Sequence, residues 1–404
     1  MSSGVADGAR ILRALAGVPL PAACVDLDAF DANIDRLFAP VRAAKKRVRI
    51  ASKSVRSPAL MKHVAERGGD LVIGYMTASA SETAYYAEHG VRDLLLAYPT
   101  VQPSDAALLA SANRHATAAV VVDEAAQLAP LADAARAAQT TIPIVLDIDT
   151  SWRPVGPRVH VGVRRSPLRE PAEVVTLARR VAAHATLRFH GLLGYEAQIA
   201  GMPDRPHARR WSNPLVRAMK RGSQPAVADQ RARVVAALVA AGLAPAIVNG
   251  GGTGSVAWSS TDPALTEVAI GSGFLVGHLF DRYAGLALEP AIAFALQVTR
   301  RPAPGIVTCF GGGWPASGAA GLDRLPLPVW PSGATLLGAE GAGEVQTPVV
   351  LPRGTDLALG DAVLFRPAKS GELAEHVAEY HLVRGDRVVG TAPTYRGLGR
   401  TFLG

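Results

Sequence analysis

Short apolar runs alternate with amphipathic stretches along most of the first two thirds of this 404-residue chain. The apolar runs begin near residues 48, 71, 93, 118, 142, 187, 246 and 266. Because each run is continuously apolar, it is typical of a parallel strand covered on both faces. Eight such strands, most of them followed by a helical pattern, predict an α/β fold of the (β/α)8 TIM-barrel type. A doubly wound sheet is the alternative; it is less favoured because its glycine-rich loop normally follows the first strand, whereas here it follows the seventh.

Helices are predicted between the strands from capping residues and from the spacing of apolar side chains. Residues 79–82 form a capping box at the start of one helix. After the sixth strand comes a long irregular segment, and the next helix is expected only at 227–241. Two helices, at 6–16 and 28–38, and a strand at 22–27 are predicted before the barrel.

The alternation stops after about residue 285, where strand-like runs broken by Gly and Pro take over. This pattern predicts a second, all-β domain. We therefore place the barrel in residues 1–285 and a C-terminal β-domain in residues 286–404. The N-terminal segment 1–45, which carries the strand at 22–27, is an exception: it packs either with the barrel or on the β-domain.

Composition narrows the class of protein. Hydrophobic residues make up 49% of the chain and charged residues only 19%, so a large core is expected. Cys24 and Cys309 lie far apart without metal-ligand spacing, and we expect neither a disulfide framework nor a metal site from them. This use of cysteine makes a reducing cytoplasm the expected location. No run of about 20 uninterrupted apolar residues is present, so we expect no membrane span.

The chain has a formal net charge of +8, but no nucleic-acid-binding motif accompanies it, and we expect no nucleic-acid partner. The densest basic run is 207–221. A solvated loop is the favoured interpretation of this run. A lid that attracts an anionic substrate is the alternative.

A lysine and two glycine-rich turns follow strands of the predicted barrel, at the end where active sites of such barrels lie. Lys53 comes just after the first strand, where burial would lower the pKa of its ammonium and make the amine nucleophilic toward aldehydes. The turns at 250–255 and 271–273 follow the seventh and eighth strands, the usual phosphate position. Hydroxyls of Thr253, Ser255 and Ser272 are expected to add donors. A phosphate opposite a buried lysine predicts pyridoxal 5′-phosphate as the cofactor.

The chain resembles the fold-type III pyridoxal-phosphate enzymes, the alanine racemase-like barrels. Residues 25–33 resemble the family's entry segment, 49–56 its cofactor-lysine motif, and 249–255 its phosphate loop. Within the group it is most similar to the D-threonine aldolase and D-serine dehydratase branch, through 191–195 and the C-terminal pattern ending at 393–397. The C-terminal domain is accordingly identified as D-serine dehydratase-like.

The resemblance implies roles for particular residues. Lys53 matches the catalytic Schiff-base lysine, and Tyr195 matches a tyrosine of the cofactor pocket. The other cofactor-binding residues that it implies are Asn249, Gly252, Thr253, Gly254, Gly271, Ser272 and Gly273.

Several positions depart from the family pattern. The branch ends with a pair of metal ligands after a proline, and here Tyr395 and Gly397 occupy those places, so we expect no metal. Tyr395 and Arg396 become candidate substrate contacts instead. His160 and Arg164 lie near the place where such enzymes keep an arginine, and they are further candidates.

For other polar residues a purely structural role is an alternative to a functional one. Asp147 and Asp149 end the fifth strand, where they serve catalysis or simply accept hydrogen bonds from loop N–H groups. His190 is interpreted as a hydrogen-bonded barrel histidine, and His376 as an ordinary polar residue of the β-domain.

Together these observations predict a pyridoxal-phosphate-dependent lyase, either an aldolase or a dehydratase, acting on a small, D-configured β-hydroxy amino acid. An amino-acid racemase is the first alternative, although the tyrosine segment that supplies its second base is absent. A non-catalytic cofactor-binding protein is the second, and the predicted β-domain argues against it. The resemblance further implies a homodimer with shared active sites.

Overall fold

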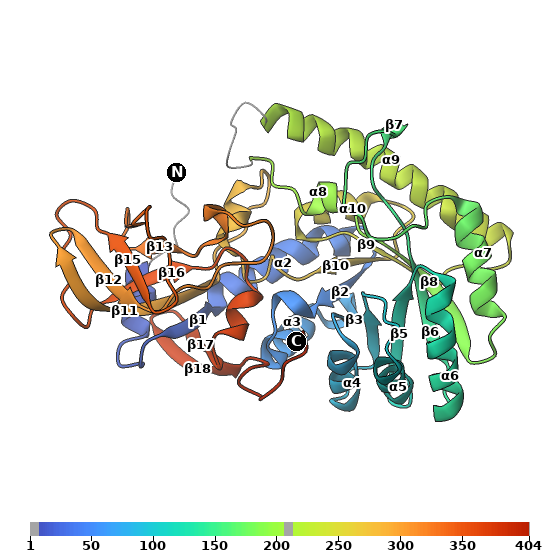
Figure 1. Cartoon of the computed structure of the whole chain (residues 1–404), viewed down its shortest axis with the longest axis horizontal. Helices are drawn as coiled ribbons and strands as arrows, with labels where there is room; N and C mark the ends of the chain where they lie inside the picture. Colours follow the sequence, from blue (N-terminus) through green and yellow to red (C-terminus); the bar gives the residue numbers. More distant parts are fainter. Residues whose placement is uncertain (1–7, 206–212, 404) are drawn as a thin grey trace. The chain divides into compact units, whose positions relative to one another are not determined.

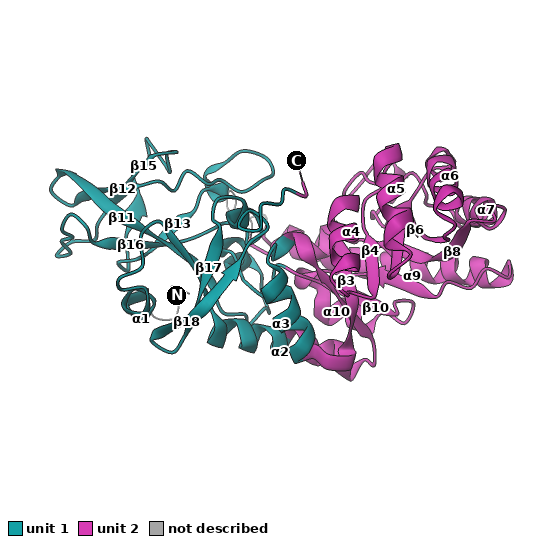
Figure 2. Ribbon diagram, turned by 90° about the horizontal axis from the view of Figure 1, so that it is seen from below, with its two compact units in different colours: residues 1–36, 54–67, 272–401 teal, residues 37–53, 68–271, 402–404 magenta. Residues whose placement is uncertain are grey.

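The computed structural model describes residues 8–205 and 213–403. Contacts divide the chain into two compact units, coloured separately in Figure 2. The barrel unit comprises residues 37–53, 68–271 and 402–404, and the β unit comprises 1–36, 54–67 and 272–401. The division does not follow sequence order, because the chain segment around residue 54 leaves the barrel unit and returns to it at residue 68.

Eight parallel strands close the barrel in the order β10-β2-β3-β4-β5-β6-β8-β9, which confirms the predicted barrel architecture (Figure 1). The strands are β2 (Arg47–Ala51), β3 (Val72–Thr77), β4 (Asp93–Leu96), β5 (Thr117–Val122), β6 (Ile142–Asp147), β8 (Leu187–Gly194), β9 (Ile247–Gly250) and β10 (Glu267–Ile270).

Helices cover the outside of these strands, as Figure 1 shows for α4 to α7. Ser79 caps α4 as predicted, its hydroxyl accepting the Glu82 N–H at 3.2 Å. Strand residues alternate between a cluster inside the barrel, such as Leu95 and Val121, and a cluster packed on the helices, such as Leu96 and Val120. The helices of this unit include α4 (Ala80–Glu88), α5 (Pro103–Ala112), α6 (Leu128–Ala138), α7 (Pro171–Ala182), α8 (Ala197–Ala200), α9 (Asn213–Ala240) and α10 (Val256–Thr261).

Helix α9 begins fourteen residues earlier than the sequence pattern predicted, at Asn213 rather than at 227. The loop expected for the basic run 207–221 is therefore wrong from residue 213 onward, while its first residues lie outside the described part of the chain. Pro225 inside the helix misled the prediction, because proline normally ends a helix. Tertiary contacts hold the first turns instead: the buried Lys220 ammonium donates to Asp204 at 2.8 Å.

The second unit contains a nine-stranded sheet with the path β14-β15-β12-β11-β1-β17-β18, to which β16 and β13 are added. Strand β1 (Ala22–Asp26) pairs antiparallel with β11 and parallel with β17. The other strands are β11 (Ile292–Ala303), β12 (Ile306–Phe310), β13 (Leu327–Trp330), β14 (Thr335–Leu336), β15 (Gln346–Val350), β16 (Ala362–Arg366), β17 (Glu379–Arg384) and β18 (Arg387–Pro393).

The remaining helices are α1 (Gly8–Ala14), α2 (Leu27–Ala43) and α3 (Pro58–Gly68), and a short strand β7 (Pro154–Pro157) follows β6. Cys24 and Cys309 are both buried and form no disulfide. No helix in the described ranges combines the length and the apolar character needed to cross a membrane.

A buried ion network joins the first barrel strand to the last. Arg49 on β2 is fully buried and donates to Glu267 on β10 from Nε at 2.6 Å and from Nη2 at 2.9 Å. Its Nη1 donates to Asp93 on β4 at 2.7 Å. Burial alone would lower the pKa of Arg49, but Glu267 and Asp93 together raise it above its ordinary value. The charge therefore stays paired inside the barrel.

Replacing Arg49 with Met should destabilise the protein by about 3–5 kcal/mol, because Glu267 is left buried without its cation. The free energy of unfolding, measured by urea denaturation, provides the check. Arg47→Met is the matched control, because Arg47 lies on the same strand but is exposed. The control should change stability by less than about 0.5 kcal/mol. Equal effects of the two substitutions would contradict the role given to the network.

Candidate active site

Lys53 lies in a short 3-10 turn, Ser52–Ser54, directly after β2. The buried Ser52 fixes this turn by donating its hydroxyl to the Met76 carbonyl on β3 at 2.9 Å. The Lys53 side chain itself is exposed, so the expectation of a buried lysine is wrong for this chain. The turn carries the residue beyond the end of the strand, where barrel neighbours no longer surround it. Its Nζ donates to the Tyr98 hydroxyl at 2.7 Å.

An arginine stands between two tyrosines at the same end of the barrel. The Arg165 guanidinium lies 5.6 Å from the ring centre of Tyr98 and 5.9 Å from that of Tyr195. Both distances are within the range of cation–π attraction. Tyr98 follows β4 and Tyr195 follows β8. Lys53, Tyr98, Arg165 and Tyr195 thus form a row of side chains that come from separate strand ends. A Cβ on Gly252 would lie 3.3 Å from the Tyr195 ring, which continues the row to the glycine-rich loop.

Asp147, the last residue of β6, anchors Arg165. The Arg165 Nε donates to Asp147 Oδ2 at 3.1 Å, and its Nη2 donates to the Ala97 carbonyl at 3.1 Å. Burial raises the pKa of Asp147 to about 7, against the opposing charge of Arg165. Its carboxyl group therefore changes charge near neutral pH, in contact with the central cation of the row. A small cavity beside the pair is lined by both side chains and by Tyr195.

Asp149 has a structural role. Its carboxylate accepts the Ser151 N–H and hydroxyl, each at 2.8 Å, and pairs with Arg153 at 2.6 Å. Burial raises the pKa of Asp149, but the Ser151 hydrogen bonds and the charges of Arg153 and Arg169 outweigh it, so the pKa lies below its ordinary value. Of the two alternatives for this residue, the hydrogen-bonded loop carboxylate therefore fits.

The glycine-rich loop after β9 needs its glycines for space. Gly251 has φ +81°, and a Cβ there would meet a Val268 methyl at 2.7 Å. A Cβ on Gly252 would meet Ala200 at 3.1 Å and the Tyr195 ring at 3.3 Å. The absence of side chains lets the loop backbone lie against these neighbours, as a phosphate-binding loop requires.

A buried carboxylate, that of Glu196, fixes this loop through hydrogen bonds. It accepts the Gly251 N–H at 3.1 Å, the Ser255 hydroxyl at 2.9 Å and the Ser259 hydroxyl at 2.7 Å. It is also paired with the buried Arg231. The expectation that the Ser255 hydroxyl serves a phosphate is therefore wrong, because that hydroxyl already donates to Glu196.

The remaining sequence-predicted residues of the barrel unit lie in several places. Asn249 donates its amide to Glu267 at 2.7 Å and so belongs to the Arg49 network. His160 and Arg164 lie in the segment between β7 and α7. Arg164 is exposed there, and His160 Nε2 lies 3.4 Å from the Val163 carbonyl oxygen. The described contacts do not connect either residue with the row. Thr253 and Gly254 continue the glycine-rich loop, and Gly271 follows β10 directly.

Ser272 and Gly273 continue the chain into the β unit, where the Ser272 carbonyl accepts the Val276 N–H at 3.0 Å. The 393–397 turn also belongs to this unit. Tyr395 is buried, and its N–H donates to the carbonyl of Arg56 at 3.0 Å. Any Cβ on Gly397 would lie 1.9 Å from the Ala378 carbonyl oxygen, so no side chain fits there.

Arg396, in the same turn, is exposed, unlike the buried Tyr395. Burial lowers the pKa of His376, and the positive charge of Arg396 lowers it further. Among the residues that the structure describes, no three His, Cys, Asp or Glu side chains come together as a possible metal site.

Sequence reasoning missed Tyr98 and chose Arg164 where the structure uses Arg165. Tyr98 could have been found, because it follows the third barrel strand as Lys53 follows the first. Arg165 could not have been separated from Arg164, because the segment after β6 shows no periodicity that tells which side chain faces the barrel.

Comparisons with known proteins identify the family of this chain. The family model described as "Alanine racemase, N-terminal domain" matches residues 25–277. The 3-hydroxy-D-aspartate aldolase of Paracoccus denitrificans (strain Pd 1222) is 28% identical over 256 residues, which cover 63% of this chain and 60% of that protein. The D-threonine aldolase of Arthrobacter sp. is 26% identical over 297 residues, 72% of this chain and 70% of that protein. The match to the first of these aldolases thus spans about three fifths of its length.

Two solved structures share the whole fold. The D-threonine aldolase from Filomicrobium marinum superposes with a TM-score of 0.79 at 24% identity, covering 95% of this chain and 96% of that chain. The D-threo-3-hydroxyaspartate dehydratase from Delftia sp. HT23 superposes with a TM-score of 0.77 at 18% identity, covering 94% of this chain and 98% of that one.

The raised pKa of Asp147 predicts a pH dependence of stability. Between about pH 4 and about pH 7 the folded protein binds a proton that the unfolded chain has released. The free energy of unfolding should therefore fall across this window as pH rises. Across the whole window this change is on the order of 4 kcal/mol, and it should be absent in Asp147→Asn.

Urea denaturation of both proteins at several pH values provides the measurement. Asp149→Asn is the control: its own lowered pKa acts only below about pH 4, and it removes only the smallest of the influences on the pKa of Asp147, so the slope in this window should change far less than in Asp147→Asn. An identical slope in the wild type and Asp147→Asn would contradict the assignment.

Proposed function

The chain belongs to the family of proteins with an alanine racemase N-terminal domain, and on that premise we propose that it is a pyridoxal 5′-phosphate-dependent lyase. Its proposed substrate is a small β-hydroxy amino acid of D configuration, which is cleaved at the Cα–Cβ bond or loses its hydroxyl. The observation that carries the proposal is the row from Lys53 through Arg165 to Gly252 at one end of the barrel. The aldolases and the dehydratase that resemble this chain support the choice of reaction.

The residues of the row fit this cofactor. An accessible primary amine at Lys53 suits the cofactor's aldehyde, and the backbone N–H groups of the glycine-rich loop at Gly252 and Gly254 suit its phosphate. Tyr195 offers a flat ring between these two ends. Thr253, Asn249 and the 271–273 turn complete the proposed binding set. When bound, the cofactor supplies the electron sink that both lyase reactions need.

The protein groups around it have separable tasks. Lys53 would hold the cofactor and, as a free amine, would move the proton that each reaction requires: in cleavage it would take the proton of the β-hydroxyl, and in dehydration it would take the proton from Cα and return it to the leaving hydroxyl. Tyr98 positions the Lys53 amine through the 2.7 Å hydrogen bond. Arg165, fixed by Asp147, presents a cation to an anionic oxygen of the substrate or cofactor. In this proposal Arg165 takes the role that the sequence had suggested for Arg164.

A homodimer with shared active sites is part of the proposal, and it rests on the resemblance to the alanine racemase-like enzymes. Sedimentation at micromolar concentration should give a mass of two chains. A fully active single chain would contradict it.

Lys53 should carry the cofactor. The purified protein should be yellow, and borohydride should fix the cofactor on the tryptic peptide that contains Lys53. Lys53→Ala should be colourless and lose activity at least about a thousandfold, because it lacks the amine that acts as both anchor and base. Lys62→Ala, at an exposed position on α3, is the control and should stay yellow. Labelling of another lysine in the wild type would reject the assignment.

Activity should not depend on zinc. Tyr395 is buried and offers only a phenol, a poor metal ligand beside imidazole, thiolate or carboxylate, while Gly397 has no room for a side chain. A metal ligand therefore cannot stand at the second of these positions. Metal analysis of untagged protein and activity after treatment with a chelator provide the check. Stoichiometric zinc, with activity that is lost to the chelator and restored by metal, would contradict the prediction.

A further inference from the structure

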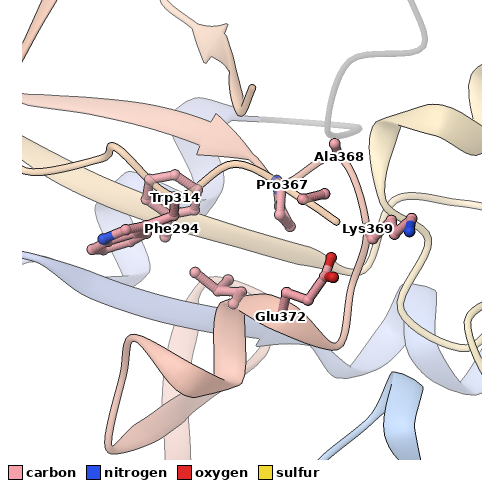
Figure 3. Close-up of a pocket in the computed structure, with 8 residues that line it drawn as sticks. Phe294, Trp314, Pro367, Ala368, Lys369 and Glu372 are labelled. Atoms are coloured by element: carbon pink, nitrogen blue, oxygen red, sulfur yellow. The ribbon is translucent and has the colours of Figure 1, made fainter. Parts of the chain in front are cut away.

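A small pocket in the β unit has not been given a role above. Its walls include Phe294 on β11, Trp314 in the loop after β12, and, after β16, residues 367–369 with Glu372 and Leu373 (Figure 3). It has room for about one water-sized group, so it admits the head of a small molecule rather than a whole amino acid.

One carboxylate oxygen in this wall is buried without a partner. Glu372 Oε1 accepts the N–H of Ser317 at 3.0 Å, whereas Oε2 has no hydrogen-bond donor among the described residues. Figure 3 shows the carboxylate of Glu372 directed toward the space below Pro367. Because an unpaired buried carboxylate oxygen is costly, the arrangement favours a ligand that brings a donor, and a cation above all.

The opposite wall is aromatic. The rings of Phe294 and Trp314 have centres 4.8 Å apart, and Trp314 stacks on His376 at 5.3 Å with the planes 9° apart. Phe294 is fully buried, so this wall is held in place. Aromatic faces attract ammonium groups and offer nothing to an anion. An aromatic wall facing a carboxylate is the chemistry that recognises an organic ammonium.

The nearby lysine does not fill this role itself. Lys369 donates its ammonium to the carbonyl of Ser317 at 2.8 Å and to the hydroxyl of Ser317 at 3.0 Å. In Figure 3 its side chain extends away from Glu372. Among the described ion pairs, none joins Lys369 to Glu372.

The wall segment is tied to the turn that follows Lys53. The Ser370 hydroxyl donates to the carbonyl of Ser54 at 2.9 Å, and Glu375 pairs with Arg56 at 2.6 Å. The pocket wall and the residues that directly follow Lys53 in sequence are therefore joined within the β unit.

We propose that this pocket binds the ammonium group of a small organic cation, with Glu372 as its counter-ion and Trp314 as its aromatic face. The ammonium has two possible sources: a second amine at the far end of the substrate, or a separate small amine. Only the first source rests on the lyase function proposed above.

Methylammonium is the probe for the binding test, and calorimetric titration of the whole purified protein is the measurement. We expect saturable binding that neither methanol nor sodium chloride reproduces. Glu372→Gln should weaken it at least about tenfold, because the charge is removed while the shape is kept. Glu344→Gln, an exposed position in the same unit, should bind as the wild type does. If Glu372→Gln does not fold, Trp314→Leu tests the other wall and should also weaken binding.

An activity test distinguishes the two sources. β-Hydroxy amino acids that end in an ammonium or in a methyl group are compared by kcat/KM in the wild type and in Glu372→Gln. A preference for the ammonium that disappears in Glu372→Gln identifies the substrate as the source, and methylammonium binding without such a preference identifies a separate amine.

If no β-hydroxy amino acid is cleaved, the proposed lyase function fails, while the binding test still decides on the pocket. Absence of saturable methylammonium binding, or equal binding by the wild type and Glu372→Gln, overturns the proposal.

Discussion

The barrel depends on the ion pair that closes it. Arg49 and Glu267 are 218 residues apart in sequence, yet they meet inside the barrel where its first and last strands pair. Glu267 also accepts the amide of Asn249, so the seventh strand joins the same network. Lys53 follows Arg49 by four residues, and the glycine-rich loop follows Asn249 directly. One buried cation thus fixes the strand ends from which both ends of the candidate site extend.

A second buried ion pair fixes the glycine-rich loop after β9. Arg231 and Glu196 are both fully buried, and the remaining capacity of the Glu196 carboxylate is used by Gly251, Ser255 and Ser259. Burial raises the pKa of Glu196, but Arg231 and these hydrogen bonds outweigh it, so the pKa lies below its ordinary value. A charged carboxylate therefore orders the loop before any ligand binds. Binding then does not have to supply the free energy of ordering the loop.

In the β unit, segments far apart in sequence gather on the turn after Lys53. Tyr395 binds the Arg56 backbone, Ser370 binds that of Ser54, and the Ser57 hydroxyl donates to the carbonyl of Pro393 at 2.8 Å. The turn that carries Tyr395 and the segment that contributes Glu372 to the pocket wall are thus both hydrogen-bonded to residues 54–57.

The sequence by itself determined the barrel, because continuous apolar runs and helix caps are local signals that each strand or helix carries. It likewise identified Lys53 and the glycine-rich loop, which stand at strand ends. Tertiary structure alone decided the rest. Helix α9 extends through Pro225 because contacts such as that of Lys220 with Asp204 outweigh a local breaker. Arg165 rather than Arg164 joins the row, and Ser255 serves Glu196, because such choices depend on partners distant in sequence, which no local pattern encodes.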